Sequence, residues 1–546
     1  MAAVILRSSL ARMIGARQRR LTWSRPVAVA IGVALVAIGL CAWQLTLPNV
    51  LEGVTEYDDG VYLGAAIRFV AGVLPYRNYV FVQPPGIIVL MSPLALLGRL
   101  IGSRDALIAV RVMTALVTGL NVGLAAWLVR RRGRFAMAIA GGALAVFPLA
   151  VNADHTLMLE PYLVLFILIG SVLAFDRDEP SIRRLVCAGL CFGIAGAVKL
   201  WAVFPFCALL VCFLPRWRAR IMPLLGGCVL GFGLLCLPFV IGAPHAFIHE
   251  VLVDQLSRTS TAQNNWPIVW RLVAITGLDG IPSLSASAAP AFELLGALGL
   301  LVVVAYVLDR RMLRRIDTYI LLAALASVIG ILASPEFYRH YTYFSAPLLA
   351  ALLAVAVSGT RTAIGRITAY YRITRPLEPL IRVLFLSCAV VALVLLVAED
   401  TSYGRTVLPS GANGAIDPGA AIDTVIPKGS CVIFDEAILA IEANRFSSSS
   451  PSCPQIVDPY GMWLADTNGQ APPATPPFPT SFENAWKSYF EAAQYVVLWA
   501  PQSDYIPWDP ALLTWFDRHY GLIQVGRGSY VYSRDATTAS SHVPAP

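Results

Sequence analysis

Apolar runs of about 20 residues recur along most of this 546-residue chain, and no other feature constrains its fold as strongly. A helical run of that length spans the hydrocarbon core of a bilayer. The composition agrees with this interpretation, because 57% of the residues are hydrophobic and only 14% are charged. Soluble proteins carry about 25% charged residues. A single soluble globule is therefore excluded, and the sequence predicts a polytopic α-helical membrane protein.

Eleven spanning helices are predicted, and the arginines between them predict their direction. The predicted spans are 27–47, 106–129, 135–152, 160–175, 184–199, 200–215, 221–243, 290–308, 317–334, 342–358 and 380–398. The first span follows an arginine-rich segment and lacks a small-residue cleavage site, so we expect a retained helix with a cytoplasmic N-terminus. Every second loop is then basic, as the positive-inside rule requires: 130–134, 183–184, 216–220, 310–315 and 361–382. Eleven crossings put the C-terminus outside the plasma membrane.

Some apolar segments are too short for an ordinary span. Residues 85–101 are interpreted as an interfacial helix, because a span there would put the arginines of 130–132 outside. The segments 184–199 and 200–215 are interpreted as a tilted or re-entrant hairpin with Lys199 near its outer tip.

The net charge of +8 does not indicate nucleic-acid binding. The basic residues stand in short clusters between apolar runs, whereas a nucleic-acid site needs them on one polar face. Lysine occurs only at Lys199, Lys428 and Lys487. A lysine among the spans, on the predicted outer side, is therefore unusual and requires an anionic partner.

The composition changes after Ala398, where Pro, Gly, Ser and Asp replace the apolar runs. The predicted divisions are a cytoplasmic N-terminus (1–26), a transmembrane domain (27–398), an extracytoplasmic α/β domain (399–534) and a disordered tail (535–546). Within the α/β domain we expect strands near 431–434, 495–499, 522–525 and 530–533, and helices near 436–444 and 510–520. Cys431 and Cys453 lie here, and an oxidising exterior would allow a disulfide between them, a question that the sequence leaves open.

The first predicted outer loop contains two adjacent carboxylates, Asp58 and Asp59. Such a pair can supply a general base that deprotonates a hydroxyl, and it can also bind a cation or a sugar. A solvated acidic turn has the same composition. The residues alone leave these alternatives open.

The same loop continues through Tyr62 to the step Pro84-Pro85, which precedes an apolar run. The acidic pair, the tyrosine and the Pro-Pro step, in this order, resemble the GT-C glycosyltransferases that use polyprenyl-phosphate sugars. The pattern is most similar to the protein O-mannosyltransferases and to the aminoarabinose transferase of lipid A, and the resemblance is strongest over 27–360. It implies that Asp58 is the catalytic base, with Asp59 in place of the family's usual glutamate.

Other outer loops supply candidates for sugar or acceptor binding. The resemblance favours Asp154, His155 and Glu160 in the second loop, although Asp154 would equally suit a helix start. Tyr62 in the first loop and Trp266 in the long third loop are further candidates, because hydroxyl groups and indole rings suit sugars. A wet surface loop explains Trp266 as well.

The donor phosphate requires cations, and the candidates are Lys199, Arg339 and His340. Arginine can hold phosphate oxygens with two parallel hydrogen bonds, and histidine adds a charge-assisted donor. The alternatives are a structural ion pair for Lys199 and a membrane-boundary belt for Arg339 and the tyrosines beside it.

The resemblance implies inverting transfer of a sugar from a polyprenyl phosphate to an envelope glycan or glycolipid. Mannose is the favoured sugar, since an arginine-rich, lysine-poor composition suits an actinobacterial genome; arabinose is second. No Walker or GxGxxG sequence supports a nucleotide sugar. The resemblance requires no metal cofactor, although Asp58 and Asp59 could bind a divalent cation. The rival classes are a lipid-linked sugar transporter or flippase, and a glycan-binding scaffold that uses the tryptophans of the C-terminal domain, Trp463, Trp499, Trp508 and Trp515.

Overall fold

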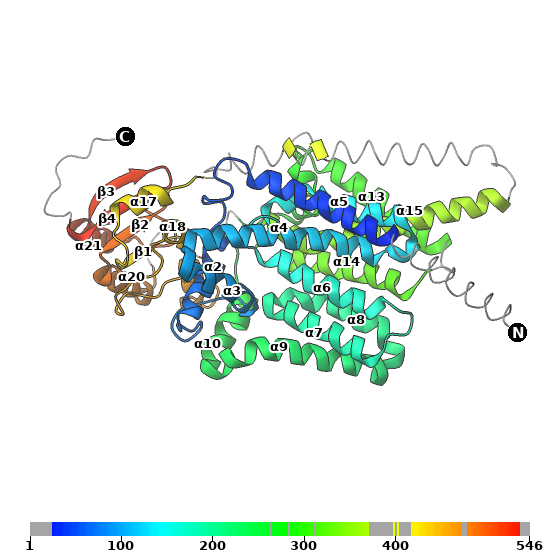
Figure 1. Ribbon diagram of the computed structural model, residues 1–546, viewed down its shortest axis with the longest axis horizontal. Coiled ribbons are helices and arrows are strands. Elements are labelled where there is room, and N and C mark those ends of the chain that lie inside the picture. Colours follow the sequence, from blue (N-terminus) through cyan, green and yellow to red (C-terminus); the bar gives the residue numbers. More distant parts are fainter. Residues whose placement is uncertain are drawn as a thin grey trace, which may run out of the picture.

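A computed structural model describes residues 25–261, 264–281, 284–308, 313–370, 397–398, 401–402, 416–471 and 478–535. The predicted N-terminal segment 1–26, the eleventh span at 380–398 and the tail 535–546 fall almost entirely outside these residues. Within the described part, the protein is a helical membrane domain followed by a small domain with a mixed sheet (Figure 1). The predicted fold class is confirmed.

Six described helical segments are long and apolar enough to cross a bilayer. They are Arg25–Leu45, α4 (Ser103–Leu128), the continuous stretch Leu200–Gly242 with α8 (Val203–Phe213) and α9 (Met222–Gly242), α13 (Ala289–Leu308), α14 (Arg315–Ala333) and the stretch Arg339–Ala363, which leads into α15 (Thr342–Tyr370). Shorter helices pack among them: α3 (Gly86–Ile101), α5 (Arg134–Ala145), α6 (Leu159–Phe175) and α7 (Ile182–Val198). These bounds lie close to the predicted ones, except that α5 ends at Ala145 and a 3-10 turn, Pro148–Asn152, replaces the rest of the predicted span. Pro148 lacks the backbone N–H that a continued helix would need.

Glycines set the closest helix contact of the membrane domain, between α7 and α9. A Cβ atom at Gly193 would lie 2.1 Å from the carbonyl oxygen of Cys228, and a Cβ at Gly227 would lie 2.1 Å from that of Val186. Small residues allow this approach, which adds van der Waals contact where lipid offers no hydrophobic driving force. The predicted hairpin around Lys199 therefore has its first arm, α7, packed between α6 and α9, while its second arm, α8, packs on α14. Whether the hairpin is re-entrant stays a prediction.

The basic loops gather at one end of the bundle. Arg130 and Arg184 both pair with Asp176, and Arg132 pairs with Asp317 at 2.7 Å. The 26 residues of α4 connect this end to the other domain, a length of about 39 Å along the helix (Figure 1). The fold thus separates the arginine clusters from the C-terminal domain, as the predicted orientation requires.

The C-terminal domain has four strands in the order β1-β2-β4-β3. Strands β1 (Val432–Phe434) and β2 (Tyr495–Leu498) are parallel, and β4 (Ser529–Ser533) pairs antiparallel with both β2 and β3 (Gly521–Gly526). The helices are α17 (Gly419–Val425), α18 (Ala437–Glu442), α19 (Pro459–Asp466), α20 (Thr480–Ala492) and α21 (Pro510–His519). All four predicted strands and both predicted helices are present. A disulfide joins Cys431 and Cys453, which confirms the pairing that the sequence left open.

The C-terminal domain packs directly on the start of α4 and on α2 (Tyr57–Val70). Ser103 donates to the carbonyl oxygen of Ile441 at 2.7 Å, and Arg104 pairs with Asp417. A Cβ atom at Gly60 of α2 would lie 2.3 Å from the backbone nitrogen of Ile438 in α18. The first outer loop and the C-terminal domain are therefore in close contact.

Candidate active site

Asp58 stands in the first turn of α2, where a carboxylate is favoured by the positive end of the helix dipole. Its Oδ2 accepts a hydrogen bond from the hydroxyl of Tyr62, one turn further along, at 3.2 Å. Burial raises the pKa of Asp58, and the negative charges of Asp458 and Glu160 add to this, whereas His340 and Lys199 lower it. Residues distant in sequence thus meet around one carboxylate, which is a stronger base than an exposed aspartate.

Lys199 occupies the break between α7 and the 3-10 turn Leu200–Ala202, where its own backbone is extended. Its Nζ lies 2.6 Å from Oε1 of Glu160, in the first turn of α6. The same Nζ stands over the rings of Trp201 and Tyr341, 4.1 and 4.2 Å from their centroids. The ion pair and the two rings hold the ammonium group of Lys199 close enough to Asp58 to lower the pKa of its carboxyl.

His340 belongs to a 3-10 turn, Arg339–Tyr341, at the start of the last described apolar helix. Its ring stacks on Tyr338 at 5.5 Å and meets Tyr341 edge-on at 4.9 Å. Among the neighbouring side chains, His340 has the largest electrostatic effect on the pKa of Asp58. The structure therefore brings together Asp58, Tyr62, Glu160, Lys199 and His340 of the predicted set.

Asp59 lies apart from this group although it is the next residue in the chain. Its carboxylate is fully buried and pairs with Arg111 of α4 at 2.6 Å. Arg111 also donates to the carbonyl oxygens of Val50, Leu51 and Gly53, and the backbone N–H of Leu157 donates to Asp59. Asp59 consequently ties the first and second outer loops to α4, an arrangement that favours a positioning role over proton transfer.

Asp154 and His155 are buried between α4 and the second outer loop. Nδ1 of His155 lies 3.2 Å from Oδ1 of Asp154, and Thr118 donates to the Asp154 carbonyl oxygen. Nε2 of His155 has no hydrogen-bond partner among the described residues. Both side chains are buried within the membrane domain.

Arg339 and Trp266 form a separate contact. The guanidinium of Arg339 pairs with Asp279 at 2.7 Å, and it stands 5.2 Å from the ring centroid of Trp266. The Arg339 side chain is 46% exposed. The structure therefore directs Arg339 to Asp279, whereas the neighbouring His340 interacts with Asp58.

Arg258 of the third outer loop is a cation that sequence reasoning did not select. It pairs with the buried Glu336 at 2.5 Å and stands 5.4 Å from the ring centroid of Tyr460. Tyr460 donates to the same glutamate at 3.0 Å. These partners come from a different outer loop and from the C-terminal domain, so no local pattern in the sequence could have revealed them.

The C-terminal domain reaches the site through α19 and the loop before α21. Asp458 caps α19 by accepting from the N–H of Gly461, and its Oδ1 also accepts from the hydroxyl of Tyr57 at 2.8 Å. The ring of Tyr57 lies 4.9 Å from that of Tyr505. The first turn of α2 is thus covered by aromatic and acidic side chains of the C-terminal domain.

The third outer loop holds this arrangement in place. Thr259 donates through its backbone N–H to Gly469 and accepts from the N–H of Ala471, and His249 lies 2.8 Å from the side-chain oxygen of Asn468. The loop therefore joins the membrane domain to the C-terminal domain beside the site.

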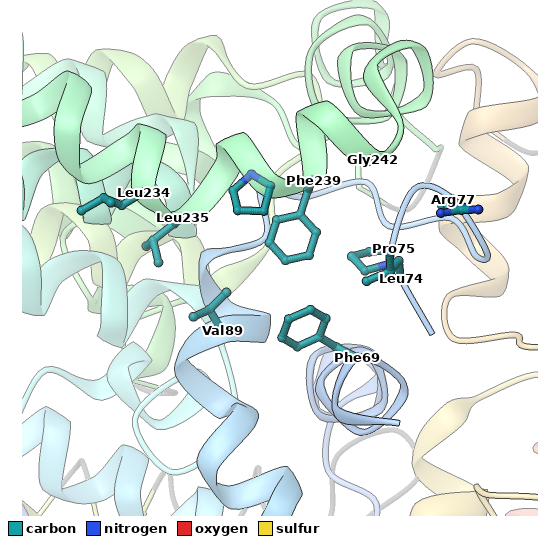
Figure 2. Close-up of a pocket in the computed structure, with 10 residues that line it drawn as sticks. Phe69, Leu74, Pro75, Arg77, Val89, Leu234, Leu235, Phe239 and Gly242 are labelled. Atoms are coloured by element: carbon teal, nitrogen blue, oxygen red, sulfur yellow. The ribbon is translucent and has the colours of Figure 1, made fainter. Parts of the chain in front are cut away.

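An apolar cavity of about 340 Å³ lies at the other end of α2 (Figure 2). Its lining comes from α2, α3, α9 and the loop between α2 and α3: Phe69, Leu74, Pro75, Arg77, Val89, Leu234, Leu235, Pro238, Phe239 and Gly242. Arg77 is its single charged residue, and Leu234 of the exposed face of α9 is 64% exposed. The rise of an α-helix puts Phe69 roughly 16 Å from Asp58 along α2.

Among the described residues, no group of three or more histidine, cysteine, aspartate or glutamate side chains has an arrangement that could hold a metal ion. Asp58 and Asp59, the pair considered for a cation, point to different partners.

Comparison with known proteins defines the class. Residues 81–335 match the model of glycosyltransferase family 87. The crystal structure of ArnT from Cupriavidus metallidurans bound to undecaprenyl phosphate is similar over 95% of this chain and 99% of that one, with 15% identity and a TM-score of 0.54. The apo oligosaccharyltransferase of Archaeoglobus fulgidus has 14% identity and a TM-score of 0.49, over 93% and 74% of the two chains. A search of the curated proteins gave no match.

The protein is a multi-pass membrane glycosyltransferase with a GT-C-like fold. Within its membrane domain, residues 81–335 are similar to glycosyltransferase family 87.

Proposed function

We propose that this protein transfers a sugar from a polyprenyl phosphate to a hydroxyl group of an envelope glycan or glycolipid, on the outer face of the plasma membrane. The observation that supports it best is the meeting of Asp58 with Lys199 and His340, which come from the first outer loop, the α7–α8 junction and the turn before α15. A base, an ammonium group and an imidazole N–H donor around one point are what a hydroxyl attack on a phosphorylated sugar needs.

In the proposed reaction, Asp58 takes the proton of the acceptor hydroxyl while the oxygen of that hydroxyl attacks the anomeric carbon of the donor sugar. The bond from that carbon to the phosphate oxygen breaks, and polyprenyl phosphate leaves with the electron pair. The attack comes from the face opposite the leaving group, so the configuration inverts. General-base assistance of this kind contributes about 10²–10⁴ in rate.

Lys199 and His340 stabilise the charge that grows on the leaving phosphate. The ammonium of Lys199 is already desolvated and held by Glu160, so little reorganisation is needed during the reaction. Arg258 adds a second positive charge near Tyr341, whereas Arg339 is engaged by Asp279.

A lipid-borne donor fits the fold better than a nucleotide sugar. The apolar cavity opens beside the exposed face of α9, and we assign it to part of the donor's hydrocarbon chain. The similar ArnT structure contains undecaprenyl phosphate. Mannose is the proposed sugar and arabinose the second choice, both on the composition of the sequence.

The arginine loops at one end of the bundle support an orientation with that end in the cytoplasm. The disulfide of the C-terminal domain supports the same orientation, because such bonds persist in oxidising compartments. The site around Asp58 then faces outward, where lipid-linked sugars are available and nucleotide sugars are not.

The test uses the purified full chain in nanodiscs with a membrane glycolipid extract. Radiolabelled polyprenyl-phosphate mannose and polyprenyl-phosphate arabinose are supplied in separate reactions, and label in the glycolipid fraction is measured. Transfer from the mannose donor supports the proposal. Transfer from the arabinose donor alone would make arabinose the transferred sugar. In liposomes, movement of intact lipid across the bilayer without release of polyprenyl phosphate would replace the enzyme with a flippase.

A further inference from the structure

Three tyrosines gather where the C-terminal domain meets α2. Tyr57 comes from the first turn of α2, Tyr460 from the first turn of α19, and Tyr505 from the loop before α21. The ring centroids of Tyr57 and Tyr505 are 4.9 Å apart, and those of Tyr460 and Tyr505 are 6.1 Å apart in an edge-on arrangement. We call these residues the tyrosine cluster.

Hydrogen bonds fix two members of the cluster. The hydroxyl of Tyr57 donates to Asp458 at 2.8 Å and accepts from the backbone N–H of Tyr460 at 3.1 Å. The hydroxyl of Tyr460 donates to Glu336, which Arg258 also holds. The rings are therefore preorganised by groups from both domains.

Tyr505 differs from the other two. Its side chain is half-buried, and its hydroxyl makes no hydrogen bond within the part of the chain that the structure describes. A half-buried tyrosine hydroxyl without a protein partner can donate to and accept from a ligand, so this one is available to a bound molecule.

The site has two sides, one formed by His340 and Lys199 and the other by the tyrosine cluster with Asp458. Asp58 lies within electrostatic range of both. The charges of His340 and Lys199 act on it, and Asp58 and Asp458 both act on Tyr505. The cationic side suits the donor phosphate. The tyrosine cluster, with its rings and the carboxylate of Asp458, suits a neutral molecule that presents C–H faces to rings and hydroxyls to polar atoms.

Three of the predicted tryptophans of the C-terminal domain do not provide an alternative of this kind. Trp463 is 5% exposed and packs against Phe478 and Phe482, and Trp508 stacks on Phe490. Trp515 stacks on His519 of its own helix. Their packing within the domain explains them.

We infer that the tyrosine cluster binds the sugar of the acceptor beside Asp58, so that the C-terminal domain selects the acceptor. The inference rests on the proposed transfer reaction, and it names the part of the chain that recognises the second substrate. Ring faces of the cluster would contact the C–H face of a pyranose or furanose, and the free hydroxyl of Tyr505 would bond one of its oxygens.

The test compares Tyr505→Ala, Tyr505→Phe and the control Tyr489→Ala in nanodiscs. Tyr489 is a half-buried tyrosine of α20 whose ring meets Trp486 at 6.0 Å, away from the cluster. We expect Tyr505→Ala to raise the KM for the acceptor at least tenfold while leaving the KM for the donor within twofold. Tyr505→Phe, which retains the ring, should raise the acceptor KM less, and Tyr489→Ala should leave it unchanged. Thermal unfolding midpoints identify a variant that fails to fold.

A binding measurement separates this inference from the proposed function. Saturation-transfer NMR with methyl glycosides of mannose, arabinose and glucose reports contact with the wild-type protein and with Tyr505→Ala. Signals that weaken in Tyr505→Ala support the subsite even if no transfer is found. The inference would be overturned if the wild type transfers sugar while Tyr505→Ala shows an unchanged acceptor KM and unchanged signals. That result would leave the proposed function intact.

Discussion

Nζ of Lys199 lies 2.6 Å from Oε1 of Glu160, and their side chains are 10% and 1% exposed. Each charge satisfies the other where water is scarce. Removal of one partner from such a pair leaves an uncompensated buried charge, whereas replacement of both can be neutral. This difference separates a structural role of Lys199 from a role toward phosphate.

We expect Lys199→Met to lower both stability and transfer, and the double variant Lys199→Met/Glu160→Leu to recover stability alone. Loss of the single partner should cost about 3–5 kcal/mol. Thermal unfolding and transfer assays on Lys199→Met, Glu160→Leu and the double variant measure stability and transfer separately. Recovered transfer in the double variant would leave Lys199 a purely structural residue.

Asp58→Asn should abolish nearly all transfer while the unfolding midpoint stays close to that of the wild type. The amide retains the hydrogen bond with Tyr62 but cannot take a proton, so we expect a loss of about 10²–10⁴ in rate. The measurement is initial transfer rate at saturating donor. Turnover at the wild-type rate would exclude Asp58 as the base.

Asp59→Asn tests the neighbouring carboxylate. We expect it to act mainly on stability, whereas Asp58→Asn acts mainly on transfer. The change leaves the buried guanidinium of Arg111 without its counter-charge, so the free energy of unfolding should fall by about 3–5 kcal/mol. Unfolding midpoints measure the fall. A stable Asp59→Asn protein without transfer activity would instead give Asp59 a direct part in the chemistry.

The sequence predicted the helices, the sheet and the meeting of Asp58 with Lys199, because hydropathy, arginine position and the motif of the first loop are local signals. The resemblance of the first loop favoured Asp58 as the base, but it did not predict what Asp59 does. That role depends on Arg111, which is 52 positions away from Asp59 and gives no sign of its role in an apolar helix. Arg258 and the tyrosine cluster were missed for the same reason, since their partners lie far away in the chain, some of them in the other domain.

Arg258→Gln should reduce transfer far more than Arg339→Gln. Arg258 holds Glu336 and stands over Tyr460 in a nearly buried position, whereas Arg339 is half exposed beside Asp279. Exposed pairs contribute about 0–1 kcal/mol. We expect a loss of at least tenfold for Arg258→Gln and less than threefold for Arg339→Gln, from transfer rates at matched protein concentration. Reversed losses would restore Arg339 as the phosphate ligand.

Stability should fall as the pH rises toward 8. Burial, with Asp58 and Asp59 nearby, raises the pKa of Glu56 to about 8, and burial together with Asp435 and Glu56 raises the pKa of Glu436 to about 8. The ordinary pKa of both groups is 4.5, so between pH 4.5 and about pH 8 the folded state binds more protons than the unfolded chain. The stabilisation is complete below about pH 4.5 and is lost as the pH passes 8.

Unfolding midpoints between pH 5 and 9 measure this slope, and Glu56→Gln should flatten it. Glu491→Gln, at an exposed carboxylate of α20, serves as the control and should leave the slope unchanged. A profile that rises over this range, or an unaltered slope in Glu56→Gln, would contradict the assignment.

Leu235→Trp should narrow the apolar cavity beside α9 and discriminate between donors by chain length. A donor with a long isoprenoid chain should show a KM raised severalfold, whereas a water-soluble donor with one or two isoprene units should be used as before. Competition between the two donors in one reaction gives the ratio directly. Ile241→Trp, on the exposed face of α9 and outside the lining, should leave the ratio unchanged.

The contact between Tyr57 and Tyr505 also has a consequence for biosynthesis. A ribosome that elongates at roughly 5–20 residues per second needs roughly 20–90 s to pass from the first tyrosine to the second. During that interval the early helices are already in the bilayer with Asp58 uncovered. The nascent chain therefore cannot complete the cover over Asp58 until its last quarter has been made, and a chain truncated before that point should insert in the membrane without transfer activity.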